Sequence, residues 1–153
     1  MGQALWVSIT SCAAVISILK TENDSLNINV IIGVLIWITG FSLEAIADLQ
    51  KSKFKKSENT NKTFISTGLW SKSRHPNYFG EITLWIGIYI ISLSSFSEIE
   101  YLTVISPLFV YLLLTRMSGI NMLEKIAEER YGHLSEYVQY KENTPVLFIK
   151  IWK

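Results

Sequence analysis

One short stretch in the middle of the chain gathers the side chains best suited to chemistry. It reads Gly68-Leu69-Trp70-Ser71-Lys72-Ser73-Arg74-His75-Pro76-Asn77-Tyr78-Phe79-Gly80-Glu81 and is called the 68–81 motif below. The motif lies between a lysine-rich segment and a very apolar one, and it mixes basic, amide, carboxylate and aromatic groups more densely than solvated loops do. We therefore predict that it holds a charged cofactor at a membrane surface.

The individual side chains suit the parts of a nucleotide. Arg74, Lys72 and the lysine run at 51–56 can neutralise phosphates, Asn77 can donate and accept amide hydrogen bonds, and Glu81 can accept one from a ribose hydroxyl. Asn77 and Glu81 are four residues apart, so both point into one groove if a helix begins at Asn77. The proline just before Asn77 suits such a start, and a helix N-terminus favours anionic groups.

Each of these residues also has a structural interpretation that stays open. Arg74 suits a membrane edge, where its long side chain reaches for water. His75 also suits a packed or capping position, and Tyr78 suits an interfacial ring. Asp48 follows Glu44 by one helical turn and suits a helix end that surfaces into water. Glu81 is harder to explain in this way, because a carboxylate one turn inside an apolar helix needs a partner.

Several function classes find no support in the sequence. No Gly-x-Gly-x-x-Gly and no phosphate loop is present, so neither of the common nucleotide-binding motifs applies. The two histidines, His75 and His133, lie on different segments, and Cys12 is the only cysteine, so we expect no metal site. The Gly-x-Ser-x-Gly motif of serine hydrolases is also absent from the sequence. The net charge of +1 gives no reason to expect a nucleic-acid partner.

The elements that position the motif are those of a membrane protein. Hydrophobic residues make up 49% of the 153 residues, and charged residues make up 18%, below the ~25% of soluble domains. Apolar segments recur at 4–19, 29–47, 82–93 and 102–114, and a helix start near Asn77 makes the third one long enough to cross a membrane. We predict an all-α polytopic bundle with about four transmembrane helices, forming one membrane domain over residues 1–153.

The charge of the connecting segments predicts the orientation. Residues 48–76 and 115–153 hold nearly all the Lys and Arg, whereas 20–28 and 94–101 are acidic or neutral. The positive-inside rule then places the N- and C-termini in the cytoplasm. The tail is amphipathic and predicts a helix that is interrupted near Gly132 and stopped by Pro145, followed by an interfacial anchor at 146–152.

Three blocks of sequence resemble the steroid 5-alpha-reductase-like C-terminal domain family of membrane proteins. They are Glu44-Ala45-Ile46-Ala47-Asp48-Leu49-Gln50-Lys51, the 68–81 motif, and Ser118-Gly119-Ile120 with Leu123-Glu124, in the same order as in that family. The resemblance covers residues 30–148 and implies a cofactor-binding region there.

The wider superfamily implied by this resemblance has two chemistries that share one pocket. Steroid and sterol reductases use NADPH, and the resemblance to them implies cofactor contacts by Asp48, Lys55, Asn77, Glu81 and Arg116. Isoprenylcysteine carboxyl methyltransferases and related enzymes use S-adenosylmethionine, and the resemblance to them implies contacts by Arg74, His75, Pro76 and Tyr78, with Glu124 nearby.

The first expectation is an NADPH-dependent reductase of a lipid or steroid-like enone or alkene. The alternatives are an S-adenosylmethionine-dependent methyltransferase of a lipid or prenylcysteine-type substrate, and a truncated, non-catalytic cofactor-binding remnant. The expected partners are a lipid-like small molecule and membrane lipids.

The catalytic acid is not identified by the sequence. Reductases of this type carry a Glu and a Tyr that polarise the enone carbonyl in an N-terminal half before the matched region, and we expect this chain to lack that half. Glu44 stands where the steroid reductases have Asn, and Ile120 where they have His. Tyr78 and Tyr111 are candidates for the acid by residue type only.

Overall fold

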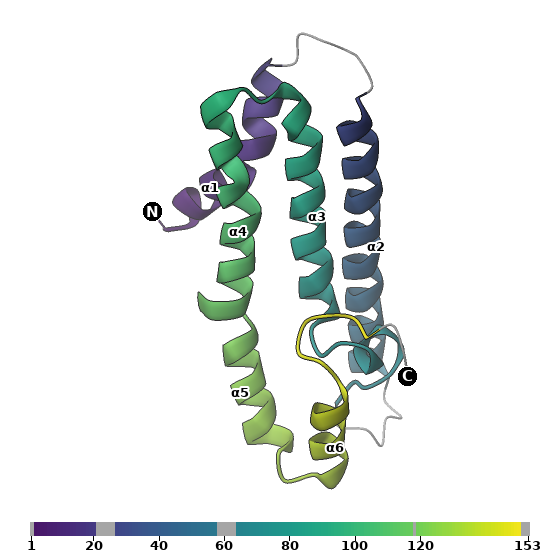
Figure 1. The fold of residues 1–153 in the computed structure, drawn as a ribbon. Helices are drawn as coiled ribbons and strands as arrows, with labels where there is room; N and C mark the ends of the chain where they lie inside the picture. The colour runs from purple at the N-terminus through teal and green to yellow at the C-terminus, as the bar shows by residue number, and fades with distance from the viewer. Residues whose placement is uncertain (1, 21–26, 58–63, 118, 151–153) are drawn as a thin grey trace. The chain divides into compact units, whose positions relative to one another are not determined.

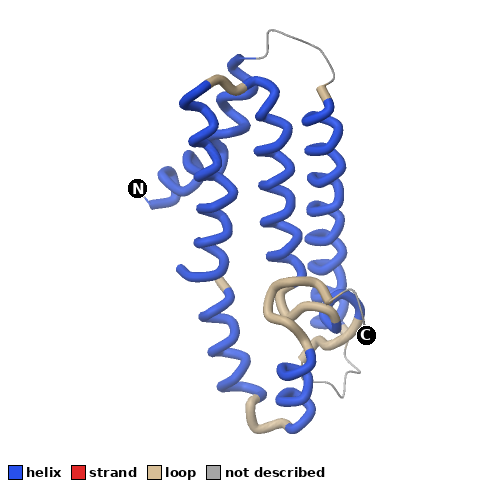
Figure 2. Tube along the Cα trace, in the orientation of Figure 1, coloured by secondary structure: helices blue, strands red, loops and turns tan. Residues whose placement is uncertain are grey.

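In the computed structural model, every regular element among the described residues, 2–20, 27–57, 64–117 and 119–150, is a helix (Figures 1 and 2). The α-helices are α1 (Gly2–Lys20), α2 (Ile28–Lys56), α3 (Pro76–Ser92), α4 (Ile105–Leu112), α5 (Ile120–Tyr131) and α6 (Ser135–Asn143). Short 3-10 helices lie at Gly68–Ser71, Leu93–Ser95 and Glu98–Val104, and a π-helical turn lies at Leu113–Met117. The all-α prediction is confirmed.

Three helical stretches are long and apolar enough to cross a membrane. They are Ile28–Lys56, Pro76–Ser95 and Glu98–Tyr131. The apolar helix Val7–Lys20 is shorter than these. Helices of this length and composition are typical of an integral membrane protein. A fourth crossing by α1 stays a prediction.

The chain divides into two compact units. Unit 1 consists of Met1–Phe41 and Glu81–Leu113, and unit 2 consists of Ser42–Gly80 and Leu114–Lys153. Helices α2 and α3 each contribute residues to both units. The extent of the predicted membrane domain, residues 1–153, stays a prediction.

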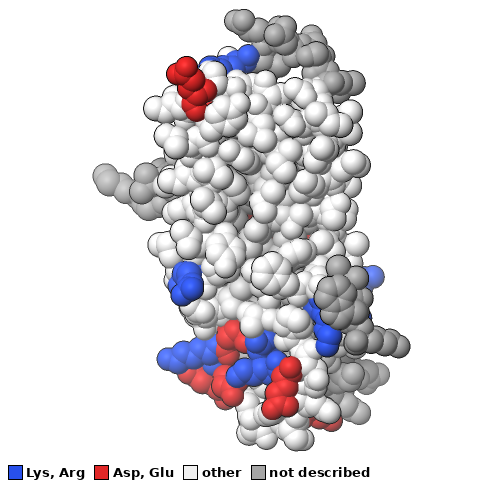
Figure 3. Space-filling model, viewed as in Figure 1, with Lys and Arg blue, Asp and Glu red and all other residues white. Residues whose placement is uncertain are grey.

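Unit 1 is held together by the packing of α1 against α4 and by a few polar contacts. Ser106 Oγ, which is buried, donates a hydrogen bond to the carbonyl oxygen of Thr10. At the end of α1, Lys20 Nζ forms an ion pair with the carboxylate of Glu100, and Ser17 and Ser95 share a hydrogen bond of 3.2 Å. Most of unit 1 visible in Figure 3 is uncharged, as expected for a surface that faces lipid.

Two glycines let α2 and α3 approach closely within unit 1. A Cβ atom added to Gly33 would lie 2.6 Å from Ile91 Cγ1 and 2.8 Å from the carbonyl oxygen of Gly87. One added to Gly87 would lie 2.6 Å from the backbone nitrogen of Trp37. Small residues at such crossings allow backbone contact between membrane helices, where apolar burial gives little driving force.

The C-terminal tail is helical in two pieces, as its pattern predicted. Helix α5 ends at Tyr131, just before Gly132, and α6 ends at Asn143, two residues before Pro145. Residues 21–26 and 58–63 of the predicted polar segments, and Trp152 of the predicted anchor, lie outside the described residues.

The close crossing of α2 and α3 makes Gly87 sensitive to one added methyl group. We expect Gly87→Ala to lower the free energy of unfolding by about 1–3 kcal/mol, because the new Cβ meets backbone that cannot move away. The matched control is Val34→Ile, which adds one methyl group to an exposed side chain of α2 and should change stability by less than about 0.5 kcal/mol. Thermal unfolding in detergent measures the midpoint of each variant. Equal midpoints for Gly87→Ala and Val34→Ile would contradict the close backbone contact between α2 and α3.

Candidate functional site

The 68–81 motif begins with a turn that is fixed against α2 in unit 2. Gly68 has φ +62°, a backbone conformation that favours glycine. A Cβ at this position would lie 2.6 Å from Gln50 Oε1 and would displace the Gln50 side chain. The backbone nitrogen of Leu69 donates to Gln50 Oε1 at 2.9 Å, and Trp70 Nε1 donates to the carbonyl oxygen of Ala47 at 3.0 Å. These bonds anchor the start of the motif to the last turns of α2.

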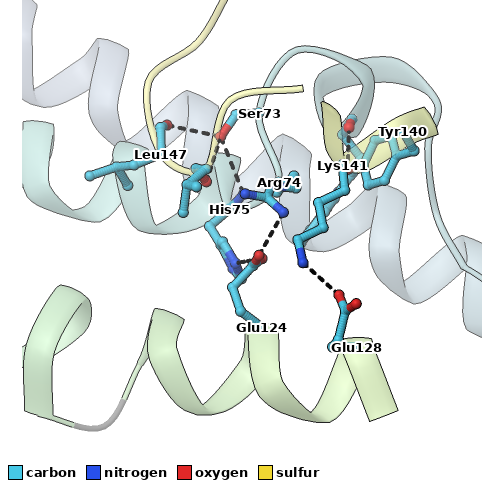
Figure 4. Close-up of polar contacts among 10 residues, drawn as sticks. Ser73, Arg74, His75, Glu124, Glu128, Tyr140, Lys141 and Leu147 are labelled. Carbon is cyan, nitrogen blue, oxygen red and sulfur yellow. Dashed lines mark hydrogen bonds and ion pairs between the residues drawn. The ribbon is translucent and has the colours of Figure 1, made fainter. Parts of the chain in front are cut away.

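The next residues of the motif are paired with the segment that follows α6. Arg74 N donates to the carbonyl oxygen of Pro145, and Lys150 N donates to that of Lys72, both at 2.9 Å. Ser73 is fully buried, and its Oγ donates to the carbonyl oxygen of Leu147 at 2.8 Å (Figure 4). Hydrogen bonds of Lys72, Ser73 and Arg74 therefore hold the backbone around Arg74 in place, independently of the contacts of the Arg74 side chain.

The side chains of Arg74 and His75 meet one carboxylate from α5. Arg74 Nη1 lies 2.6 Å from Glu124 Oε2, and His75 Nε2 lies 2.8 Å from Glu124 Oε1 (Figure 4). The side chains of Arg74 and His75 are 10% and 9% exposed, and that of Glu124 is 23% exposed. The ring of Tyr78 stacks on that of His75, with centroids 5.7 Å apart. Arg74, His75 and Glu124, called the trio below, thus connect α5 to the start of α3.

Arg74 keeps unused hydrogen-bonding capacity despite this ion pair. Its Nε and Nη1 atoms are buried, and neither makes a hydrogen bond to any described residue. The contact of Nη1 with Glu124 Oε2 at 2.6 Å compensates the charge of the guanidinium, whereas Nε has no hydrogen-bond or ion-pair partner among the described residues. A buried guanidinium with unsatisfied N–H groups is costly alone and suits an anionic ligand such as a phosphate or carboxylate.

The trio forms one wall of a pocket of about 300 Å³ in unit 2. The other walls carry six aromatic rings and two lysines, namely Phe54, Phe64, Trp70, Tyr131, Tyr137, Tyr140, Lys51 and Lys55. The ring of Phe64 lies 5.1 Å from that of Tyr137 and 5.4 Å from that of Tyr140, centroid to centroid. Lys51 Nζ lies 5.2 Å from the centre of the Trp70 ring, a cation–π distance.

Two of the tyrosines are held in the neutral form by their surroundings. Burial raises the pKa of Tyr140, so its hydroxyl stays protonated and donates to the carbonyl oxygen of Trp70 at 2.7 Å. Burial also raises the pKa of Tyr137, and the negative charge of Glu124 raises it further. The pocket therefore presents neutral rings next to cationic side chains.

The structure brings together only part of the predicted site. Lys55, Arg74, His75 and Glu124 line the pocket, whereas Asp48, Asn77, Tyr78 and Arg116 are not among its lining residues. Glu81 belongs to unit 1 and lines a different pocket there, of about 240 Å³, with Trp85 and Val110. Asn77 and Glu81 do lie one turn apart in α3, which begins at Pro76, one residue before the predicted start.

Sequence reasoning missed the aromatic character of the pocket. Trp70 belonged to the 68–81 motif, and the three tyrosines lie in the tail that was predicted to be amphipathic, but none of these rings, nor Phe54 or Phe64, was predicted as a pocket residue. A usable signal exists for part of this set, because Tyr137 and Tyr140 are three residues apart and share a face of α6. No comparable spacing links Phe64 to them.

Removing the Glu124 carboxylate leaves a buried guanidinium without its counter-charge. We expect Glu124→Gln to lower the free energy of unfolding by about 2–3 kcal/mol, below the ~3–5 kcal/mol of a fully buried pair because Glu124 is partly exposed. The control is Glu128→Gln in the same helix, which breaks the exposed ion pair with Lys141 and should cost less than about 1 kcal/mol. Denaturant titration measures the free energy of unfolding of both variants. Equal losses of stability would contradict the claim that the contacts of Glu124 with Arg74 and His75 stabilise unit 2.

The chain matches a protein family whose description names no activity. The model of a family described as "Protein of unknown function (DUF1295)" matches residues 1–144. No curated protein and no solved structure matches the chain. The family match covers all of α1 to α6, including every side chain of the unit 2 pocket, and the chain therefore belongs to the DUF1295 family.

Proposed function

We propose that this protein is a membrane-embedded oxidoreductase that uses NADPH to reduce a carbon–carbon double bond in a lipid or steroid-like enone or alkene. The observation that carries the proposal is the charge of the unit 2 pocket. Lys51, Lys55 and Arg74 line it with three positive charges, against the single carboxylate of Glu124, which Arg74 and His75 already engage. The pocket therefore attracts a ligand that brings negative charge.

This charge distinguishes the two cofactors of the resembled superfamily. NADPH carries a pyrophosphate and a 2′-phosphate, whereas S-adenosylmethionine carries a sulfonium cation and no phosphate. Phosphate oxygens match the planar N–H groups of a guanidinium, and the unsatisfied Nε of Arg74 supplies such a group in a desolvated position. The half-buried Lys51 and the exposed Lys55 act as additional point charges on the other walls of the pocket.

The rings and the volume suit one nucleotide half of the dinucleotide. Aromatic side chains bind the faces of heterocyclic bases by stacking, and Phe64, Trp70 and Tyr140 offer such faces beside the cations. The volume of about 300 Å³ is at the lower end of the ~300–1,000 Å³ range of small-molecule sites. We assign this pocket to the phosphate-bearing adenosine end.

The cofactor would supply the hydride, and the residues of this chain would bind and orient it. Arg74 and the lysines would fix the phosphates, and Glu124 would fix the orientation of Arg74. Reduction of an enone also needs a proton donor near the carbonyl oxygen. Tyr78 and Tyr111 remain candidates for that role by residue type.

A methyltransferase is the second candidate, and one observation favours it. Arg74, His75 and Glu124 meet in one cluster, and the resemblance to methyltransferases implies this set. In that case Arg74 would bind the amino-acid carboxylate of S-adenosylmethionine, and the aromatic rings would face the sulfonium, since ring faces attract cations. A non-catalytic remnant that binds the cofactor without turning it over is the third candidate.

Calorimetric titration of the detergent-purified protein with NADPH and with S-adenosylmethionine tests the proposal. We expect wild-type protein to bind NADPH and Arg74→Gln to bind it at least about tenfold more weakly, because a charge-assisted hydrogen bond to phosphate is lost. Lys125→Gln, the same change of charge on an exposed residue of α5 outside the pocket, should bind like wild type.

The outcomes separate the three candidates. Binding of S-adenosylmethionine alone would overturn the reductase in favour of the methyltransferase. Binding of NADPH without any NADPH oxidation in the presence of membrane lipid extracts and steroid enones would favour the non-catalytic remnant. Binding of neither cofactor would contradict the assignment of the pocket.

We further propose that four helices cross the membrane, with both termini in the cytoplasm. The last turn of α2 carries Lys53, Lys55 and Lys56, and Arg116 and Arg130 follow in the C-terminal part of the chain, whereas the segment after α3 carries Glu98 and Glu100. Basic residues favour the cytoplasmic side. Helix α1 would be the fourth crossing.

Fusion of reporters after Lys153 tests this topology. We expect a green fluorescent protein fused there to fluoresce and an alkaline phosphatase fused there to be inactive, because phosphatase folds only outside the cytoplasm. The control is the same pair of reporters inserted after Ser97, in the segment between α3 and α4, where the activities should be reversed. Active phosphatase after Lys153 would overturn the orientation.

A further inference from the structure

Unit 2 has a second pocket, which the proposed cofactor site does not include. Its volume is about 550 Å³, and it lies along the end of α6 and the segment that follows it, with Arg74 as the wall shared with the first pocket. The side chains that matter here are Arg74, Lys141, Lys150, Val146 and Phe148.

The charge of this second pocket favours an anion. Arg74, Lys141 and Lys150 line it, against the carboxylate of Glu142. Lys141 also pairs with Glu128 at 2.6 Å, but both side chains are 40–50% exposed, and such a pair is worth little. The strongest single feature is Arg74, whose side chain is nine-tenths buried and whose Nε has no hydrogen-bond partner among the described residues.

The apolar residues beside these cations favour a lipid as the source of the anion. Phe148 is 69% exposed, and Val146 is 37% exposed, and both line the pocket. The rings of Phe148 and Phe79 meet edge to face, with centroids 6.1 Å apart. A free inorganic phosphate would use the cations alone, whereas a lipid would also cover the apolar surface.

The outer wall of the pocket is held in place by hydrogen bonds to the 68–81 motif. The segment that forms its outer wall is tied to the 68–81 motif by the backbone bonds of Pro145 and Lys150 and by Ser73 Oγ to Leu147. A site whose walls are fixed in this way loses little conformational entropy on binding.

We propose that this pocket binds the phosphate group of an anionic membrane lipid, with Arg74 and Lys150 contacting the phosphate and Phe148 contacting the first carbons of the acyl chains. The site shares Arg74 with the proposed cofactor pocket, and its other lining residues are different. The inference does not depend on the identity of the cofactor. A lipid bound there would join α6 and the 68–81 motif to the membrane surface.

The test uses the purified full chain and a short-chain phosphatidic acid below its micellar concentration, followed by calorimetry or native mass spectrometry. We expect wild-type protein to bind it about tenfold more tightly than it binds the phosphatidylcholine of the same chain length or inorganic phosphate. Lys150→Gln and Phe148→Ser should each weaken binding several-fold, and Lys125→Gln, outside the pocket, should leave it unchanged.

Each alternative outcome contradicts a defined part of the proposal. Equal affinity for inorganic phosphate, with no effect of Phe148→Ser, would show a free-anion site and overturn the lipid. Equal affinity for phosphatidylcholine would overturn the role of the charge. Complete displacement of the lipid by saturating NADPH would show that the pocket belongs to the cofactor site. Failure of NADPH to bind at all leaves the lipid measurement unaffected, so the two proposals fail separately.

Discussion

Unit 2 depends on one carboxylate that is shared between a guanidinium and an imidazole. Glu124 comes from α5, and Arg74 and His75 come from the turn that begins α3, so the contact joins segments separated by about fifty residues of sequence. Burying Arg74 without this carboxylate would leave an uncompensated charge in a desolvated position. Because the cluster is fixed, the aromatic rings of α6 and the segment after it can pack around it, and both pockets take their shape from the same arginine.

The same contact leaves the pocket with a surplus of positive charge. Glu124 balances one cation, whereas Lys51, Lys55 and the unsatisfied edge of Arg74 remain. In a polar environment such a surplus is screened by solvent, but Arg74 is nine-tenths buried, and its attraction for an anion is correspondingly stronger. Charged side chains gather over α5 and α6 in Figure 3, the helices that carry Glu124 and Lys141.

Much of the architecture was predictable because it depends on local sequence. Apolar length gave α2 and α3, Pro76 marked the start of α3, and Gly132 and Pro145 delimited the two tail helices. Arg74, His75 and Glu124 were also predicted as site residues, but by resemblance and as separate positions. Their convergence depends on how α5 packs, which a periodic pattern in one helix does not specify.

The aromatic walls and the tight crossing of α2 and α3 were not predictable for the same reason. Phe64, Trp70 and Tyr140 come from three segments, and their shared pocket follows from tertiary bonds such as that of Tyr140 to the Trp70 carbonyl. Gly33 and Gly87 are far apart in sequence, and no second glycine lies four residues from either of them. Their role becomes visible only when each is seen to face the backbone of the other helix.

Hydrogen–deuterium exchange with and without NADPH measures most directly whether the cluster around Arg74 is a cofactor site. The account predicts slower exchange of backbone amides in residues 64–75 and 120–140 when NADPH is bound, with little change in α1 and α4. Exchange that is unchanged in residues 64–75 and 120–140 at saturating NADPH would contradict the account.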